Sequence, residues 1–291
     1  MKKNSRESLY LAAFTQFLLF FFAISALFAD EGSDKATNKA ANKIAGETAS
    51  KTLRVASYNI RICRGVGPSQ YQAEDEQDID RTVEALKRLD FDVIGLQEVD
   101  RKTDRCRGVD QIAVLAEKTG CFATYGKAID LPGGEYGIGI LSKEKPLSVK
   151  NVPLPGKEER RTLLIAEFDD FVFFNAHFSL TAESRAESAQ IVQAQLAQQS
   201  KPVIFVGDMN VASDDERARL FGEHWTVLTP DQPTFPADKP RVRLDYIQIA
   251  DPSGQIPVND PSWTARVVDS GVADEPAASD HRPVFVEFKG K

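Results

Sequence analysis

Short apolar segments of strand length recur between residues 52 and 291 and outnumber the segments that have helical spacing. The strand-like segments are residues 53–60, 92–97, 136–142, 161–168, 171–177, 202–207, 244–249 and 283–288. Helical spacing is clear only in residues 79–89, 109–119 and 182–199. Three helices cannot cover both faces of one large sheet, whereas two sheets can bury a face against each other. The sequence therefore predicts the α/β class, as a sandwich of two mainly antiparallel sheets with helices outside.

Two local signals support these boundaries. Asp169 and Asp170 separate residues 161–168 from residues 171–177, which is typical of a hairpin between neighbouring strands. Gly120 follows the second helical segment in the position where a left-handed residue commonly ends a helix.

The first 29 residues differ from the rest of the chain. Lys2, Lys3 and Arg6 precede an apolar run over residues 9–29. This pattern predicts a signal peptide that is cleaved on export, or an N-terminal membrane anchor if it stays uncleaved. We therefore expect a periplasmic, extracellular or membrane-anchored protein. Residues 30–51 are polar and predict a disordered linker, which leaves residues 52–291 as one folded domain.

The folded part of the chain is predicted to be acidic. Residues 51–291 contain 30 Lys or Arg against 38 Asp or Glu, because six basic and five acidic residues lie in the first 50. This balance disfavours tight nonspecific binding of nucleic acid but does not exclude a nuclease with a local basic groove. Cys63, Cys106 and Cys121 can form at most one disulfide within the chain, and their spacing is poor for zinc.

Polar residues gather where the expected strands end. A carboxylate beside a buried apolar run costs several kcal/mol unless it is paired or binds a metal. Asp245 lies at a strand start, and the residues at or beside strand ends are Asn59, Glu98, His177, Asp208, Asn210, Asp280 and His281.

Each of these residues also has a purely structural interpretation. Asn59 could cap a turn, Asp208 could close one, and Glu98 could pair with Arg101 or Arg105. Taken together they suit phosphoester hydrolysis, which needs oxygen ligands for a hard cation, a polarised water and donors to phosphoryl oxygens.

Seven short motifs sharpen this interpretation. They are SYNI (57–60), LQEVD (96–100), EYGIGILS (135–142), FNAHFS (174–179), GDMN (207–210), RLDYI (243–247) and SDHRP (279–283). In this order they resemble the endonuclease/exonuclease/phosphatase superfamily of DNase I-like hydrolases, over about residues 53–288, and especially its small bacterial metal-dependent members. The resemblance implies a four-layer α/β sandwich.

The resemblance also implies roles for the metal and the attacking water. Glu98 resembles the principal Mg²⁺ ligand, with Mn²⁺ as an alternative ion. Asn59 and Asp280 are expected close to the same ion or bridged to it through water. Asp208 and Asn210 resemble the pair that orients the attacking water or a phosphoryl oxygen.

Further roles concern proton transfer and the substrate. Asp245 and His281 resemble a carboxylate and imidazole pair, and His177 resembles a group that binds a phosphoryl oxygen. Either His281 or Asp208 could take the proton of the water. Substrate contacts are expected from Tyr136, Arg161 and Arg243, and Arg241 and Arg185 could add charge.

These observations predict an enzyme, since the catalytic motifs are complete. We expect a monomeric Mg²⁺-dependent phosphodiesterase or phosphatase acting on a small or lipid-derived phosphoester. A secreted nuclease is the alternative, and a noncatalytic binding module of the same fold is a third interpretation that the intact site disfavours.

Overall fold

The computed structural model describes residues 52–66, 77–251 and 266–290. The predicted signal peptide or anchor (1–29) and linker (30–51) lie outside the described residues. Within the described ranges, no helix is both long and apolar enough to span a membrane.

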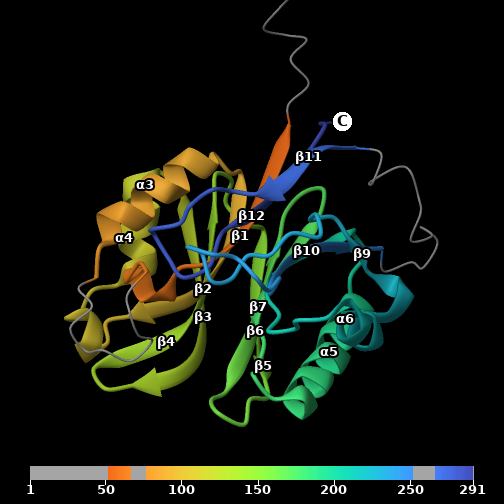
Figure 1. The fold of residues 1–291 in the computed structure, drawn as a ribbon, viewed down its shortest axis with the longest axis horizontal. Helices are drawn as coiled ribbons and strands as arrows, with labels where there is room; N and C mark the ends of the chain where they lie inside the picture. Colours follow the sequence, from red (N-terminus) through yellow and green to blue (C-terminus); the bar gives the residue numbers. More distant parts are fainter. Residues whose placement is uncertain (1–51, 67–76, 252–265, 291) are drawn as a thin grey trace, which may run out of the picture. The chain divides into compact units, whose positions relative to one another are not determined.

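Two sheets of six strands each form the centre of the described part of the chain (Figure 1). The first sheet has the order β11-β12-β1-β2-β4-β3. Its strands are β1 (Leu53–Asn59), β2 (Val93–Arg101), β3 (Phe122–Leu131), β4 (Gly134–Ser142), β11 (Val267–Val272) and β12 (Val284–Phe288). Only β1 and β2 pair in parallel; the other pairs are antiparallel.

The second sheet has the order β5-β6-β7-β8-β10-β9. Its strands are β5 (Ser148–Leu154), β6 (Arg161–Glu167), β7 (Val172–His177), β8 (Val203–Asp208), β9 (Thr226–Val227) and β10 (Asp245–Ala250). Only β7 and β8 are parallel, and β6 and β7 form the predicted hairpin.

Helices cover the outer face of each sheet, as Figure 1 shows. Helices α3 (Ile79–Leu89) and α4 (Gln111–Thr119) pack on the first sheet, around residues such as Leu86 and Leu96. Helices α5 (Ala182–Leu196) and α6 (Asp214–Phe221) flank the second sheet, around Phe205. A third apolar cluster, which includes Val55, Ile140, Phe173 and Val206, fills the space between the sheets. The predicted α/β sandwich with four layers is thus confirmed.

Polar contacts also join the two sheets. The Nε2 atom of Gln97 in β2 donates to Oδ1 of Asn175 in β7 at 2.7 Å, and Asn175 Nδ2 donates to the carbonyl oxygens of Leu96 and Gly139. Because all these groups are buried, the bonds fix how the strand ends of one sheet face those of the other.

The helix boundaries agree with the expected ones within a few residues. Side chains of Asp78 and Asp110 cap the first turns of α3 and α4, and Gly120 ends α4 with φ 71°. Periodicity did not reveal β3, β5, β11 or α6. The first three have many half-buried or exposed positions, so they lack the apolar pattern that marks a central strand. Cys63, Cys106 and Cys121 are all free.

Candidate active site

Three neighbouring strands of the second sheet bring polar residues to one edge. His177 ends β7, Asp208 ends β8 and Asp245 begins β10. His177 is in register with Asp208 across the parallel pair, and Asp245 is in register with Asp208 across the antiparallel pair. Gly207 allows the close approach of β7 and β8, because a Cβ there would lie 2.0 Å from the carbonyl oxygen of Ala176. The three side chains therefore meet as the sequence predicted.

His281 reaches the same place from the loop before β12. Its Nδ1 atom lies 2.9 Å from Oδ2 of Asp245, which also accepts a hydrogen bond of 2.5 Å from Thr234 Oγ1. The ring of Phe235 packs on the imidazole, with the ring centroids 4.9 Å apart. Burial disfavours the imidazolium, but the carboxylates of Asp245 and Asp208 outweigh that effect and raise the pKa of His281 to about 10. His281 is therefore a cation near neutral pH.

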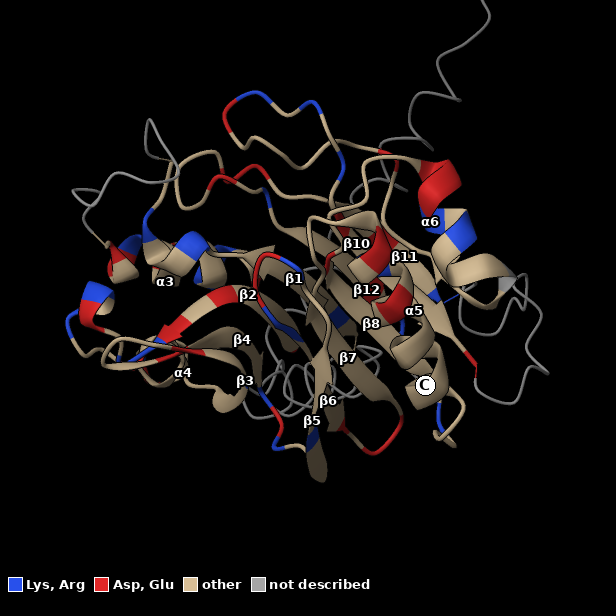
Figure 2. Ribbon diagram, turned by 90° about the horizontal axis from the view of Figure 1, so that it is seen from below, with Lys and Arg blue, Asp and Glu red and all other residues tan. Residues whose placement is uncertain are grey.

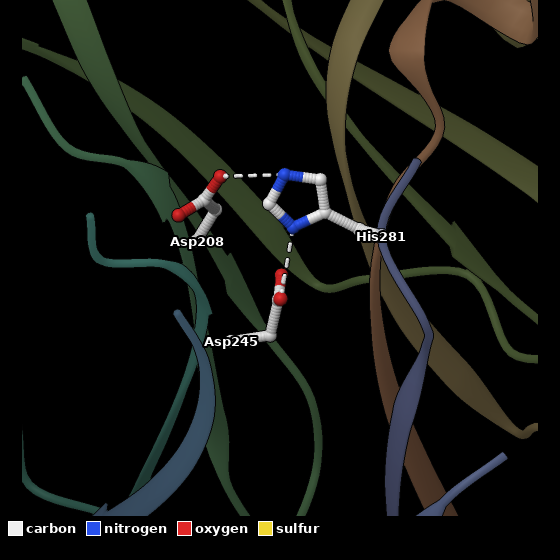
Figure 3. A group of neighbouring side chains, drawn as sticks. All are labelled: Asp208, Asp245 and His281. Atoms are coloured by element: carbon white, nitrogen blue, oxygen red, sulfur yellow. Dashed lines mark hydrogen bonds and ion pairs between the residues drawn. The ribbon is translucent and has the colours of Figure 1, made fainter. Parts of the chain in front are cut away.

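Asp208 lies between the two imidazoles (Figure 3 shows it beside His281 and Asp245). Its Oδ2 atom is 3.6 Å from Nε2 of His281 and 3.5 Å from Nε2 of His177. Burial raises the pKa of Asp208 to about 6, while the charge of His281 opposes that rise. This carboxylate can therefore both gain and lose a proton near neutral pH.

The Nδ1 partner of His177 is a cation, whereas the Nδ1 partner of His281 is a carboxylate. Arg161 Nη1 lies 2.9 Å from His177 Nδ1, and Arg161 is itself held by the carboxylates of Glu158 and Glu159. A guanidinium can only donate, so Nδ1 must be the acceptor and Nε2 must carry the hydrogen. Burial, and then the charge of Arg161, hold the pKa of His177 well below its usual range. His177 is a neutral donor whose N–H points toward Asp208.

Glu98 lies in an irregular part of β2 rather than at its end, which corrects the predicted strand boundary. The pairing of β2 with β4 shifts register between Leu96 and Val99, and Glu98 has φ 55°. A positive φ at a residue other than glycine is uncommon and costs roughly 1–2 kcal/mol. The strand continues to Arg101, so the irregularity re-aims one side chain without ending the strand. Burial, and then the charge of Asp280, raise the pKa of Glu98.

Asn59 is oriented differently from a direct metal ligand. Its Nδ2 atom donates to Glu98 Oε1 at 3.0 Å and to Asp208 Oδ2 at 3.1 Å, while its Oδ1 accepts from the backbone N–H of Arg61. An amide N–H₂ group cannot ligate a cation, so Asn59 instead connects and orients two carboxylates. Asp280 pairs with Arg61 Nε at 3.5 Å.

Asn210 and Tyr136 complete the predicted set around these groups. The backbone N–H of Asn210 donates to Asp208 Oδ1, and its Nδ2 donates to the carbonyl oxygen of Phe178. Tyr136 is buried, and burial, followed by the negative charge of Glu98, raises its pKa well above the usual range. Its phenol is therefore protonated at any working pH.

Arg243 and Arg185 contact residues other than those of this cluster, and a substrate contact by Arg243 stays a prediction. The Arg243 guanidinium stacks on Tyr246 and contacts Thr229, Asp214 and Asp231. Arg185 pairs with Glu216 and donates to the carbonyl oxygens of Ser179 and Leu180. Arg241 is exposed.

Three contributors were not recognised from the sequence as parts of the site. Thr234 holds Asp245, Glu158 holds Arg161, and Ser279 donates through Oγ to the carbonyl oxygen of Asn59 at 2.6 Å. Thr234 and Glu158 lie in loops without a periodic pattern, so no signal marked them. Ser279 lies inside the SDHRP motif and could have been selected.

The residues present can hold a divalent cation. Within the described ranges, carboxylate oxygens of Asp208 and Asp245 lie within 4.8 Å of each other and of an imidazole nitrogen of His281. The carboxylates can ligate a cation, whereas the protonated imidazole of His281 can only donate. Asp245 Oδ1 is buried and accepts no hydrogen bond from any described residue, which leaves one carboxylate oxygen available. Glu98 and Asp280 supply further carboxylates whose mutual repulsion a cation would relieve.

Comparison with known proteins agrees with this arrangement. A sequence model of the Endonuclease/Exonuclease/phosphatase family matches residues 56–281.

Similar structures include the endonuclease/exonuclease/phosphatase from Beutenbergia cavernae DSM 12333, at 23% identity and a TM-score of 0.65 over 82% of this chain and 72% of that one. The mannosyl-6-phosphatase from Bacteroides thetaiotaomicron VPI-5482 is 21% identical, with a TM-score of 0.61 over 80% and 98% of the two chains. TDP2 from D. rerio, complexed with a single-strand DNA product, is 18% identical, with a TM-score of 0.59 over 82% and 99%.

At these identities the structural neighbours show a shared fold. The family match spans most of the chain and includes every residue of the cluster described above, from Asn59 to His281. This chain therefore belongs to the endonuclease/exonuclease/phosphatase family and is a hydrolase of phosphoester bonds.

Proposed function

We propose that the protein is a Mg²⁺-dependent hydrolase of small phosphoesters that acts outside the cytoplasm. One observation carries the chemistry: the buried carboxylate of Asp208 lies 3.5 to 3.6 Å from two imidazoles, one neutral and one cationic. A carboxylate that can accept a proton is thereby placed beside two N–H donors suited to phosphoryl oxygens.

Glu98 would hold the cation, with Asp280 close to it. Mg²⁺ prefers carboxylate oxygens and retains several waters, so a site with few protein ligands suits it, and Mn²⁺ could replace it. When bound, the cation would polarise a phosphoryl oxygen and lower the pKa of a bound water. Asn59 would hold Glu98 and Asp208 in their relative positions through its two N–H bonds.

The residues of the chain divide the proton transfers between them. Asp208 is the better base, since His281 already carries a proton near neutral pH. Asp208 would take the proton of the attacking water, and the side chain of Asn210 would help to orient that water. The Nε2–H groups of His281 and His177 would donate to phosphoryl oxygens, where negative charge grows in the transition state.

A small substrate fits the distribution of charge better than a long nucleic acid does. Figure 2 shows acidic and basic residues interspersed over the described ribbon. The chain carries a net charge of −7. A nuclease that grips many phosphates usually concentrates its cations. A secreted nuclease stays as the second candidate, because a short single-stranded substrate needs few contacts.

Hydrolysis of bis(p-nitrophenyl) phosphate by the purified full chain tests the proposal. We expect turnover with Mg²⁺ or Mn²⁺ that EDTA abolishes and added metal restores. Absence of metal-dependent turnover with this ester, p-nitrophenyl phosphate and a panel of sugar phosphates, lipid phosphoesters, RNA and DNA would refute it. On active substrates, a steep decline of kcat/KM with salt would favour the nuclease, whereas a shallow decline would favour the small ester.

A further inference from the structure

Arg105 is a cation near the candidate active site that the proposed mechanism does not use. It follows β2 in the short 3-10 turn of Asp104–Cys106. Its side chain is 42% exposed, whereas that of its partner Asp100 is fully buried. The Arg105 guanidinium therefore combines a rigid anchor with access from solvent.

The anchor fixes the direction of the guanidinium. Arg105 Nε and Nη2 donate to the two oxygens of Asp100 at 2.7 and 2.8 Å. Thr103 Oγ1 donates a hydrogen bond to Asp100 Oδ2 at 2.7 Å, and the backbone N–H of Asp100 donates to Oε1 of Gln111. A bidentate pair of this kind leaves little rotational freedom. Among the described residues, Nη1 of Arg105 has no hydrogen-bond partner, so its two N–H groups are available to a ligand.

Tyr136 connects Arg105 to the candidate active site. The Cζ atom of Arg105 lies 5.1 Å from the centroid of the Tyr136 ring, and Tyr136 is in register with Asp100 across β2 and β4. The charges of Glu98, Arg161 and Arg105 all act on the Tyr136 phenol. No hydrogen bond to a described residue engages its hydroxyl group.

The order of contacts separates Arg105 from the reacting phosphate. Asp208 contacts Asn59, and Asn59 contacts Glu98. The charge of Glu98 acts on both Tyr136 and Arg105, whereas Arg105 makes no hydrogen bond or ion pair with Asp208, His177 or His281 among the described residues. A phosphate that is attacked beside Asp208 is thus held by His177 and His281, and Arg105 is free to bind another part of the same substrate.

We infer that Arg105 binds a second anionic group of the substrate, a further phosphate or a carboxylate, with the Tyr136 hydroxyl as a supporting donor. This inference rests on the proposed phosphoester hydrolysis and narrows its substrate class to small esters with two anionic groups. Arg105 is then a specificity-determining residue.

Matched substrates that differ by one phosphate test this role in the full chain with Mg²⁺. Thymidine 5′-(p-nitrophenyl phosphate) is compared with its 3′-phosphorylated form, and fructose 6-phosphate with fructose 1,6-bisphosphate. For at least one pair, we expect the wild type to have a kcat/KM about tenfold higher for the more phosphorylated member. This preference should arise from a lower KM at similar kcat. Arg105→Gln should reduce that preference to about one while leaving kcat within about twofold. Arg101→Gln is the matched control, since Arg101 is similarly exposed and pairs with Asp110 and Glu135.

The double variant Asp100→Asn with Arg105→Gln is a second test in case Arg105→Gln alone does not fold. It removes both charges of the pair, so no unpaired carboxylate stays buried. Equal use of both members of each pair by the wild type, or an unchanged preference in both Arg105 variants, would overturn the inference. If neither these pairs nor the panel of phosphoesters given above is hydrolysed, the proposed function fails, and binding measured by calorimetry still tests the role of Arg105. Thymidine 3′,5′-bisphosphate should then bind more tightly than thymidine 5′-monophosphate to the wild type but not to Arg105→Gln, and equal binding by the wild type would overturn the inference.

Discussion

Oδ2 of Asp245 lies 2.9 Å from Nδ1 of His281, and this contact makes His281 a cation at the centre of the site. His177, on the other side of Asp208, has Arg161 in the corresponding position and is neutral. Two identical side chains therefore have different charges because their Nδ1 partners have opposite charges. This difference decides how activity should depend on pH and what His177 contributes to the reaction.

Asp245→Asn should shift the alkaline limb of the pH profile to lower pH. The raised pKa of His281, about 10, keeps its donor proton in place below that pH, so wild-type kcat/KM should decline only toward pH 10. Without the carboxylate charge the pKa of His281 falls, and activity should be lost at a lower pH. Profiles of kcat/KM from pH 5 to 10.5 measure the shift. The exposed Asp269→Asn is the control, and coincident profiles for Asp245→Asn and wild type would contradict the assignment.

Asp208 should determine the acidic limb of the same profile. A base must be ionised, so activity should rise with pH as Asp208 loses its proton. The midpoint of this rise should lie at or below the Asp208 pKa of about 6. Asp208→Asn should lower kcat by about 10³-fold or more at every pH. Recovery of its activity at high pH would show that another group accepts the proton.

Glu98→Ala should impair metal binding and turnover together. Loss of the proposed principal ligand is expected to lower kcat by roughly 10²-fold or more and to raise the Mg²⁺ concentration for half-maximal activity. Titration of activity with MgCl₂ after EDTA treatment measures both effects. Glu117→Ala, on the exposed face of α4, should behave as wild type. An unchanged metal dependence in Glu98→Ala would place the cation elsewhere.

His177→Gln and His177→Ala should differ if His177 acts as a neutral donor. The amide of Gln can replace the Nε2–H group, whereas Ala cannot. We expect His177→Ala to lose about 10²-fold in kcat and His177→Gln to retain most of the wild-type rate. Equal losses in the two variants would argue for proton transfer by His177. His224→Gln, at an exposed position, controls for general effects of the substitution.

Phe205→Ala should destabilise the second sheet and its helices. Phe205 is fully buried and its ring packs against Phe174, Phe178, Phe221 and Trp225. The cavity should lower the free energy of unfolding by about 3–5 kcal/mol. Urea denaturation followed by circular dichroism measures the change. Phe122→Ala, at a position that is 49% exposed, should change the stability by less than about 1 kcal/mol.

The sequence was informative about the central strands and the residues at their ends. His177, Asp208 and Asp245 could be predicted to meet because apolar runs define strand length and adjacent strand ends share one edge of a sheet. The edge strand β5 could not be predicted in this way, because most of its side chains are exposed and carry no apolar period.

Tertiary structure alone decided how the site residues are oriented and charged. Asn59 and Asp208 are 149 residues apart, yet a hydrogen bond between them orients the amide away from a ligand role. The positive φ of Glu98, the loop residue Thr234 beside Asp245 and the Arg161 partner of His177 likewise leave no local pattern. The sequence by itself therefore determined the fold class, because it follows from local periodicity, and the strand ends together with the seven motifs selected the candidate site residues. The protonation of each imidazole and the direction of each carboxylate depend on contacts between distant segments, which exist only once the two sheets have packed together.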